Sequence, residues 1–393
     1  MTQKPKIPKA IWMLGFVSMF ADISTEMVQA ILPLFMLETL GASIALIGLI
    51  DGVAEIISSI AKIYSGYLSD FFAKRKYLAA FGYGLSALSK LIFPFITIAE
   101  MVMGAKTIDR IGKGIRGAPR DALIADIAPK EIEGACYGLR QAMDTIGAFL
   151  GPIIALIILF YSPKNYILIF WVAILPAFAS PLILLFIKEQ ERPQNPNSKK
   201  IHLEWQNLLA LGKDYWFIIF MAILFALPKF SDGFLILRAN ELHVKNQYIP
   251  LVYIILNIVY AAFAYPIGAI SDRIGKYGIL AFGMFSMIIA HICFAFGQNW
   301  EILVVGLIFW GLYLGFTQGA FSTLIAQHAP PELRGTSFGF LYLANGLALL
   351  FASGFGGLIW QKFGSQNAFL SGAIIGLFAL FVWLIFARRF KQS

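Results

Sequence analysis

The sequence predicts an all-α integral membrane protein in which twelve transmembrane helices form two pseudo-two-fold related six-helix bundles. Hydrophobic residues make up 59% of the 393 positions and charged residues 13%, whereas soluble domains carry about 25% charged residues. The apolar residues gather in segments of about twenty residues or slightly more, the length that crosses a bilayer core. These segments lie near residues 10–37, 44–66, 77–97, 100–126, 136–160, 166–187, 214–239, 248–270, 277–297, 301–327, 336–360 and 366–387.

Loops that are rich in basic residues alternate along the chain with loops that are poor in them. Loops on one side of the membrane, together with both termini, hold most of the Lys and Arg residues, whereas the opposite loops hold Lys164, Lys245 and Lys362. Since the side richer in Lys and Arg is the cytoplasmic one, we expect both termini in the cytoplasm of a bacterium and the chain in its inner membrane. The net charge of +9 then reflects topology and contact with anionic lipid, and it gives no reason to expect nucleic-acid binding.

One long polar segment divides the chain. Residues 188–213 are typical of a cytoplasmic linker, which would separate a bundle at 1–187 from a bundle at 214–393. The two bundles repeat each other, because Leu-Ile-Ala-x-x-Ala-Pro-x-Glu occurs at 123–131 and again 201 residues later at 324–332. Parallel repeats of six spans are typical of membrane proteins that bind a solute at the interface between the repeats.

The repeat identifies the fourth span, which hydropathy alone would assign to a charged loop. Its counterpart, 301–327, is plainly apolar, and Glu100 and Gly114 align with Glu301 and Gly315. Residues 100–126 therefore form a membrane helix, although each central Lys or Arg costs about 2.5–3.5 kcal/mol there. Such a helix is expected to face a water-filled cavity, acidic neighbours and an anionic ligand, with Gly112, Gly114 and Gly117 allowing close approach.

Two loops carry a family resemblance. Gly66-Tyr-Leu-Ser-Asp70-Phe-Phe-Ala-Lys74-Arg75-Lys76, between spans two and three, resembles the signature of the major facilitator superfamily. It departs at Phe71 and Ala73, where that signature has a basic residue and a glycine, while 268–276 keeps both. The resemblance implies the major facilitator fold and alternating-access transport. We expect gating by residues of these loops and of spans four and five: Gly66, Asp70, Lys74, Arg75, Arg116, Arg120, Asp126, Arg140, Gly147, Gly151, Pro152, Asp272 and Arg273.

Span one carries two acids on one face. Asp22 and Glu26 are four residues apart near the middle of the helix, and Asp22-Ile-Ser-Thr-Glu26 resembles a motif of a subgroup of facilitator-type transporters. Burial in a low dielectric favours the protonated form of a carboxyl group, so we predict proton coupling at Asp22, Glu26 and Glu55 of span two. The alternative for the span-one acids is an ion pair with a span-four cation. Asp51, nearer the outer edge, is expected to be solvated.

Span four supplies most of the predicted substrate contacts. We place Lys106, Asp109, Arg110 and Lys113 at a central cavity. Arg110, with Gly114 four residues later, resembles the span-four motif whose arginine is linked to proton movement in exporters of the superfamily, although Lys106 replaces an apolar residue. The inner residues Arg116, Arg120 and Asp126 are expected to form a cytoplasmic gate network with Asp70 and Arg140.

Span five contains glycines at the spacing of an antiporter motif. Gly138, Gly147, Gly151 and Pro152 resemble that motif, whose terminal glycine pair is replaced here. Glycine thins a helix face and proline kinks the helix, which would limit leakage through the cavity; ordinary small-residue packing is the alternative. Asp144 is a further predicted substrate contact.

The second half carries far fewer charges. Lys229 and Asp232, beside Pro228 in span seven, either contact the substrate or pair with each other. We expect Arg238 to extend toward the outer interface. His291 and Lys90 are expected to be structural.

These features predict a proton-coupled secondary transporter for a small anionic or zwitterionic organic solute, such as a siderophore-like carboxylate or a drug, with export by antiport slightly favoured. A proton symporter that imports an organic anion, and a transporter-like membrane sensor without turnover, are the alternatives. The sequence has no P-loop, metal-ligand spacing or nucleophile arrangement, so we expect no enzyme activity, cofactor or metal. We expect Cys136 and Cys293 to be buried thiols and the protein to be a monomer that binds solute, protons and lipid.

Overall fold

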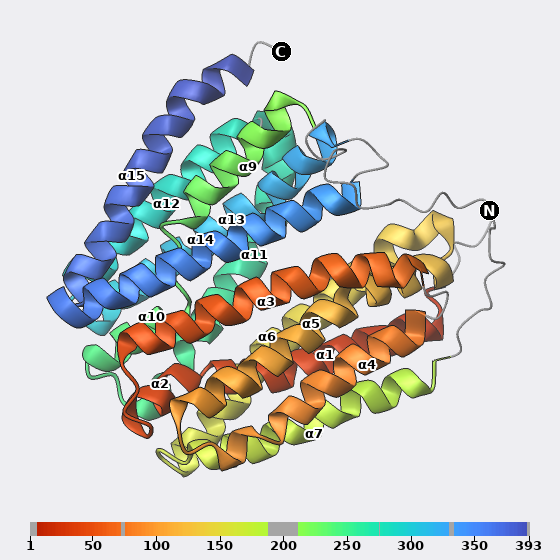
Figure 1. Cartoon of the computed structure of the whole chain (residues 1–393), viewed down its shortest axis with the longest axis horizontal. Helices are drawn as coiled ribbons and strands as arrows, with labels where there is room; N and C mark the ends of the chain where they lie inside the picture. Colours follow the sequence, from red (N-terminus) through yellow and green to blue (C-terminus); the bar gives the residue numbers. More distant parts are fainter. Residues whose placement is uncertain (1–5, 72–74, 188–210, 275, 330–333, 391–393) are drawn as a thin grey trace. The chain divides into compact units, whose positions relative to one another are not determined.

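The computed structural model describes residues 6–71, 75–187, 211–274, 276–329 and 334–390, in which α-helices are joined by short connections, some of them 3-10 turns (Figure 1). The helices of the first half are α1 (Lys9–Gln29), α2 (Leu32–Glu38), α3 (Ile44–Phe71), α4 (Arg75–Lys90), α5 (Ala99–Ile127), α6 (Glu133–Tyr161) and α7 (Tyr166–Leu185). Those of the second half are α9 (Lys213–Ala226), α10 (Gly233–Glu241), α11 (Leu251–Ile274), α12 (Lys276–Phe296), α13 (Trp300–His328), α14 (Arg334–Phe363) and α15 (Ser365–Phe390).

These helices occupy the positions of the twelve predicted spans, with α1 and α2 together forming span one and α9 and α10 forming span seven. Ten spans of the described residues are long and apolar enough to cross a membrane by composition alone. The other two are α5, which carries many charges, and the pair α9–α10, whose helices have 14 and 9 residues. Helix α5 has 29 residues, the same length as its repeat counterpart α13, which agrees with the assignment of 100–126 as a helix.

The chain forms two compact units. Unit 1 contains residues 1–31 and 57–202, and unit 2 contains residues 32–56 and 203–393. Helix α2 and the first half of α3 therefore group with the helices of the second half of the sequence. Residues 188–210 of the predicted linker lie outside the described residues, and the division into bundles at 1–187 and 214–393 stays a prediction.

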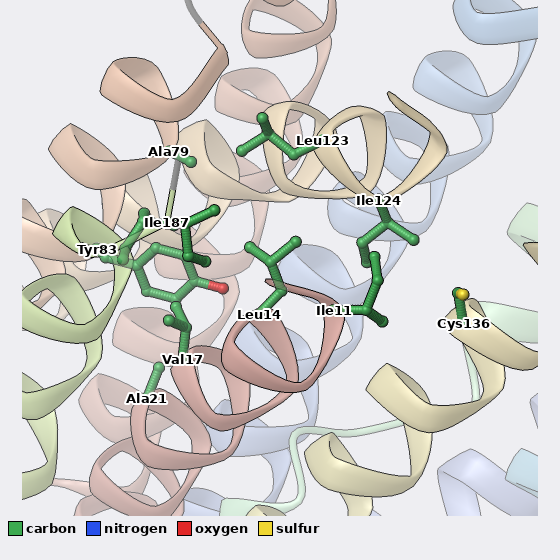
Figure 2. Packing of buried hydrophobic residues seen from close by; sticks show 11 residues of the cluster. Ile11, Leu14, Val17, Ala21, Ala79, Tyr83, Leu123, Ile124, Cys136 and Ile187 are labelled. Atoms are coloured by element: carbon green, nitrogen blue, oxygen red, sulfur yellow. The ribbon is translucent and has the colours of Figure 1, made fainter. Parts of the chain in front are cut away.

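The core of unit 1 forms where α1, α4, α5, α6 and α7 meet (Figure 2). Its buried residues are Ile11, Leu14, Val17, Ala21, Ala79, Tyr83, Leu123, Ile124, Cys136, Leu184 and Ile187. The ring of Tyr83 lies among Val17, Leu14 and Ile187 in Figure 2, and its hydroxyl oxygen is 3.2 Å from Ser18 Oγ. Cys136 is a buried free thiol, and Cys293 is a free thiol that is half-buried.

Glycines let the charged helix α5 pack directly on its neighbours. A Cβ placed on Gly112 would lie 2.6 Å from the Gly82 carbonyl oxygen of α4, and one on Gly114 would lie 2.5 Å from Ala61 Cβ of α3. A Cβ on Gly117 would meet no atom within 4 Å. Two of the three predicted close approaches are therefore present, and they bring backbone dipoles and short polar side chains next to the charges of α5.

Candidate functional site

The deepest charged pair in unit 1 joins α4 to α5. Lys90 Nζ lies 3.0 Å from Asp109 Oδ2, and the two side chains are only 3% and 6% exposed. Ser86 Oγ donates a hydrogen bond of 2.7 Å to Asp109 Oδ1, and Lys90 Nζ lies 5.5 Å from the centre of the Phe93 ring. Each charge is thus compensated inside the protein, an arrangement that favours a structural role for the pair. The prediction that Asp109 contacts substrate remains untested, but the geometry gives this carboxylate another partner.

Asp22 of α1 pairs with a cation of α5. Its Oδ1 lies 3.7 Å from Arg116 Nη2, and the Asp22 side chain is 22% exposed while that of Arg116 is 5% exposed. The Arg116 guanidinium lies 4.6 Å from the centre of the Tyr83 ring. This cation–π contact helps to hold the arginine next to Asp22. The sequence left open whether Asp22 has a span-four partner. The structure supplies Arg116, a residue that the sequence assigned to gating.

A second cluster lies around Arg120. Arg120 Nε donates to Asp121 Oδ1 at 3.0 Å, and its Nη1 donates to Ser18 Oγ at 3.1 Å and lies 4.0 Å from Asp144 Oδ2. Arg140 Nη1 donates a hydrogen bond to the same Asp144 oxygen. The Ser18 hydroxyl and the Tyr83 ring connect this cluster to Arg116. We refer to these side chains as the charged network: Asp22, Arg116, Arg120, Asp121, Arg140 and Asp144.

The charged network is balanced, because its three arginines face three carboxylates. Arg140 Nε lies 3.9 Å from Asp121 Oδ1, and Asp144 Oδ1 is a buried oxygen without a hydrogen-bond partner among the described residues. A buried acceptor that is left unsatisfied is costly. Because arginines and carboxylates are equal in number, the charged network has no excess positive charge when all three acids are ionised. Protonating one acid would leave one arginine uncompensated.

The predicted gating residues fall into separate groups. Arg75 Nη1 of α4 contacts both Asp126 oxygens of α5 at 3.0 and 3.1 Å, while Arg120 and Arg140 belong to the charged network. Lys74 lies outside the described residues, and the structure describes helical backbone but no side chain for the remaining loop residues: Gly66, Asp70, Asp272 and Arg273. A single gate network that includes Asp70 therefore stays a prediction.

The glycines of span five lie against the acids of span one. Helix α6 packs along α1, and Gly147 and Gly151 approach the α1 backbone next to Asp22 and Glu26. Pro152 is buried within the same helix. Two features that the sequence predicted separately, the acidic pair and the glycine motif, are thus in direct contact.

The remaining predicted residues of unit 1 are half-buried. Lys106, Arg110 and Lys113 lie on α5, and Glu26 lies on α1. Lys113 makes no hydrogen bond or ion pair with any residue that the structure describes. An uncompensated ammonium group inside a membrane helix is unfavourable, so Lys113 is the cation of α5 most in need of an external partner.

In unit 2, the break between α9 and α10 is held by polar side chains of neighbouring helices. His291 Nε2 donates to the Pro228 carbonyl oxygen at 2.8 Å, and Trp310 Nε1 donates to Asp232 Oδ1 at 3.1 Å. His291 is completely buried among aromatic rings, as expected of a structural histidine. Lys229 is half-buried and makes no ion pair with Asp232 or with any other described residue.

Serine residues at the same break bind the first half of α3. Ser231 Oγ donates a hydrogen bond to Asp51, and Ser353 Oγ of α14 accepts a hydrogen bond of 3.0 Å from the Ser231 amide. Asp51 is thus half-buried and hydrogen-bonded, and the expectation that it is solvated is wrong. Glu55, one turn later on α3, is half-buried too. The sequence offered no signal for Ser231 or Ser353, because isolated serines are common in membrane helices.

Arg238 also differs from its prediction. Its side chain is 10% exposed and donates hydrogen bonds to the Phe294 and Gly297 carbonyl oxygens at 2.9 and 2.7 Å, with an ion pair of 2.6 Å to Glu241. The end of α12 leaves carbonyl groups without helical partners, and a guanidinium in reach satisfies them. Arg238 therefore caps α12 instead of extending to the membrane interface.

The comparisons with known proteins agree with this architecture. The family model of the Major Facilitator Superfamily matches residues 14–234 and 230–393. The chain belongs to this superfamily. An MFS-type transporter of Methanocaldococcus jannaschii is 32% identical over 390 residues, which cover 96% of each chain. The multidrug resistance protein MdtH of Proteus mirabilis is 25% identical, over 88% of this chain and 83% of its own length.

A solved structure of a POT family transporter superposes with a TM-score of 0.82 at 13% identity, over 97% of this chain and 96% of that one. At this identity the likeness shows the fold alone. Together with the family match, it makes the chain a multi-pass membrane transporter of the major facilitator superfamily and not an enzyme.

Proposed function

We propose that this facilitator is a proton-coupled secondary transporter for a small anionic or zwitterionic organic solute. The observation that carries the proposal is the ion pair between Asp22 and Arg116 within a balanced network of acids and arginines. Charged residues are rare within membrane segments, and where they occur they mark ion and substrate pathways. The network has the composition that an exchange between proton and anion requires.

The coupling follows from charge balance. When Asp22 is ionised it compensates Arg116, and the Arg116 guanidinium is not available for a solute. When Asp22 or Glu26 takes up a proton, a guanidinium or ammonium group of α5 becomes free to bind a carboxylate. The solute and the deprotonated acid thus compete for the same cations. Protonation at one face of the membrane and release at the other make solute movement depend on the proton gradient.

Two observations favour export by antiport. The glycine motif of α6 resembles the antiporter motif, and the relative MdtH is named as a multidrug resistance protein. Symport of an organic anion would use the same charged network, so the direction of proton movement decides between the two. We place the protein in a bacterial inner membrane with both termini in the cytoplasm, as the positive-inside rule predicts.

Reconstitution into proteoliposomes tests the proposal. Counterflow with citrate, amino acids and a zwitterionic fluoroquinolone should show that at least one anionic or zwitterionic solute accumulates transiently. A lipophilic cation without an acidic group should not exchange. If only such cations exchange, the assignment of the solute class is wrong, although the protein remains a transporter.

The orientation can be tested with single cysteines in a background without Cys136 and Cys293. Thr97 lies in the exposed connection before α5 and Glu131 in the exposed turn between α5 and α6. Thr97→Cys should react with an impermeant maleimide added to intact cells. Glu131→Cys should react only after permeabilisation, because the charged helix α5 crosses the membrane between them. Equal labelling of both positions from one side would contradict the assignment of α5 as a span.

Lys113 should bind the anionic group of the solute. A hydrogen bond to a charged group contributes about 1.5–3 kcal/mol, so Lys113→Ala should raise the KM for the solute found by counterflow about tenfold or more, with little change in the maximal rate. Lys362→Ala, at an exposed position, is the matched control and should leave KM unchanged. An unchanged KM in Lys113→Ala would remove this residue from the binding site.

A further inference from the structure

A polar pair lies exposed at membrane depth in unit 2. The Tyr260 hydroxyl of α11 donates a hydrogen bond of 2.9 Å to Oε1 of Gln318 on α13. Tyr260 is near the middle of the predicted span 248–270, and Gln318 lies one turn beyond Leu314, the middle residue of α13. Gln318 is exposed and Tyr260 is half-buried. No motif of the sequence includes either residue, and neither belongs to the charged network.

The middle of α13 is exposed only beside this pair. Helix α13 packs against α11 and α12 (Figure 1), and of residues 306–320, all of which the structure describes, only Gln318 and Gly319 are exposed. A Cβ placed on Gly319 would meet no atom within 4 Å, so open space lies beside Gln318. Helix α15, by contrast, exposes apolar side chains in its middle, such as Leu377 and Phe378. The open face of α13 therefore has a polar character that a surface against lipid lacks.

The amide group of Gln318 keeps hydrogen-bonding capacity. Its nitrogen carries two N–H donors and makes no hydrogen bond with any residue that the structure describes. Because polar groups that face hydrocarbon without a partner are costly, this face is suited to water or to a polar solute. A role in joining the helices needs no exposed amide. Gly311 already brings α13 against α11, since a Cβ there would lie 2.8 Å from Val259 Cβ.

The repeat relates this face of α13 to the face of α5 that carries Lys113. Gln318 lies 201 residues after Gly117, which follows Lys113 by one turn. A Cβ on Gly117, like one on Gly319, would meet no atom within 4 Å. Parallel repeats bind their solute near the membrane midplane, at the interface between the repeats. Equivalent faces of the two helices thus combine open space with a side chain that can donate hydrogen bonds.

We infer that Gln318 binds a hydrogen-bond acceptor of the solute, a carboxylate or carbonyl oxygen, and that Tyr260 is the positioning residue for its amide. Because the Tyr260 hydroxyl donates to Oε1, the amide oxygen is held by the protein and the N–H groups are left for the solute. The contact is uncharged, so it selects among solutes without changing the balance of the charged network. The inference rests on the proposed function and adds to it a binding group from unit 2.

Cysteine modification tests whether the pair faces water. In a background without Cys136 and Cys293, Gln318→Cys should react with the anionic reagent 2-sulfonatoethyl methanethiosulfonate in membrane fragments, where both faces are accessible. Leu377→Cys, at a position 54% exposed in the middle of α15, is the control. It should react at least about tenfold more slowly, because apolar surroundings disfavour the reactive thiolate. The member of the counterflow panel that exchanges, at several times its KM, should slow the reaction of Gln318→Cys at least about threefold by occupying the site.

Transport kinetics test the contact itself. Gln318→Leu should raise the KM for the exchanging solute about two- to tenfold, as the loss of one uncharged hydrogen bond predicts, with little change in the maximal rate. Tyr260→Phe should raise KM by a smaller factor, again without a change in the maximal rate. Gln318→Glu should raise KM more than Gln318→Leu, because a carboxylate repels an acceptor. Gln327→Leu, the same substitution at an exposed position near the end of α13, is the matched control and should leave KM unchanged.

The outcomes separate the inference from the proposed function. If Gln318→Cys and Leu377→Cys react equally slowly, or if an anionic solute exchanges with an unchanged KM in Gln318→Leu, the role of the pair is refuted while the proposed function stands. A KM lowered by Gln318→Glu would mean that the solute donates a hydrogen bond here, and it would overturn the assignment of an acceptor. If only lipophilic cations exchange in counterflow, the proposed solute class is wrong and the acceptor assignment is refuted with it.

Discussion

Glu26→Gln should abolish uphill transport and preserve exchange of solute down its own gradient. Glutamine has the shape of a protonated glutamate but cannot release a proton, so the exchange between solute and proton is blocked while the cavity stays intact. Asp22→Asn should also lose uphill transport while it keeps or strengthens the binding of an anionic solute, because the amide leaves the Arg116 guanidinium, 3.7 Å away in the native protein, without its counter-charge and free to bind a carboxylate. Accumulation against a concentration gradient, measured in proteoliposomes with an imposed pH difference, reports the first effect.

Solute exchange without a pH difference reports the second effect. Asp214→Asn is the control, since Asp214 is exposed in the first turn of α9 and should leave both activities at wild-type values. If both neutral variants still concentrate solute with the wild-type pH dependence, proton coupling lies at another acid. Asp144 and Asp232 would then be the next positions to neutralise.

The second large effect concerns stability. Removing one partner of a buried ion pair leaves an uncompensated charge and costs about 3–5 kcal/mol, so Lys90→Met and Asp109→Leu should each lower the unfolding temperature strongly. The double variant should recover most of the loss, because the space between α4 and α5 is then filled by apolar groups of similar volume. Thermal unfolding of the purified protein, followed by fluorescence, measures both.

A substitution of an exposed lysine is the control for these single and double variants. Lys245→Ala, in the exposed connection between α10 and α11, should leave the unfolding temperature unchanged. If the double variant is as unstable as either single variant, the pair between Lys90 and Asp109 has no specific coupling. If Asp109→Leu keeps its stability but loses solute binding, Asp109 is a substrate contact, as the sequence alone suggested.

The sequence was sufficient for most of the architecture. The length of the apolar segments predicts the spans, and the Lys and Arg residues of the loops predict their orientation. The repeat is visible in stretches such as 123–131 that recur after 201 residues. The assignment of the fourth span also came from the repeat, because its counterpart 301–327 is plainly apolar; in the structure, α5 and α13 have the same length despite their different charge. Apolar length and loop charge are properties of single segments, which local sequence determines, and the repeat can be found by comparing the two halves of the sequence.

Partner choice between helices was less predictable. The sequence left open which span-four cation pairs with Asp22 and assigned Arg116 to gating, whereas the structure pairs Asp22 with Arg116. The rotation and depth of α5 relative to α1 depend on the glycine contacts with α3 and α4 and on the position of the Tyr83 ring. Such packing details involve residues far apart in the sequence, and no periodicity within one helix records them.

The polar contacts at the break in span seven were missed for a related reason. Pro228 signals an interruption, but the groups that satisfy the freed backbone come from His291 and Ser353 on two other helices, and Trp310 of a third helix binds the Asp232 side chain. Arg238 was misplaced because its carbonyl partners at the end of α12 are 56 and 59 residues away in the chain. Isolated polar residues in apolar helices can be assigned only once their neighbours are known.

Proton movement that accompanies solute movement tests the central claim most directly. Proteoliposomes loaded with a pH-sensitive dye and with the solute identified by counterflow are diluted into solute-free buffer, with the membrane potential clamped. The wild-type protein should move protons into the lumen as solute leaves, and Glu26→Gln should release solute without a pH change. Solute efflux from wild-type vesicles with no change in lumenal pH would contradict proton coupling, and acid movement in the same direction as the solute would make the protein a symporter.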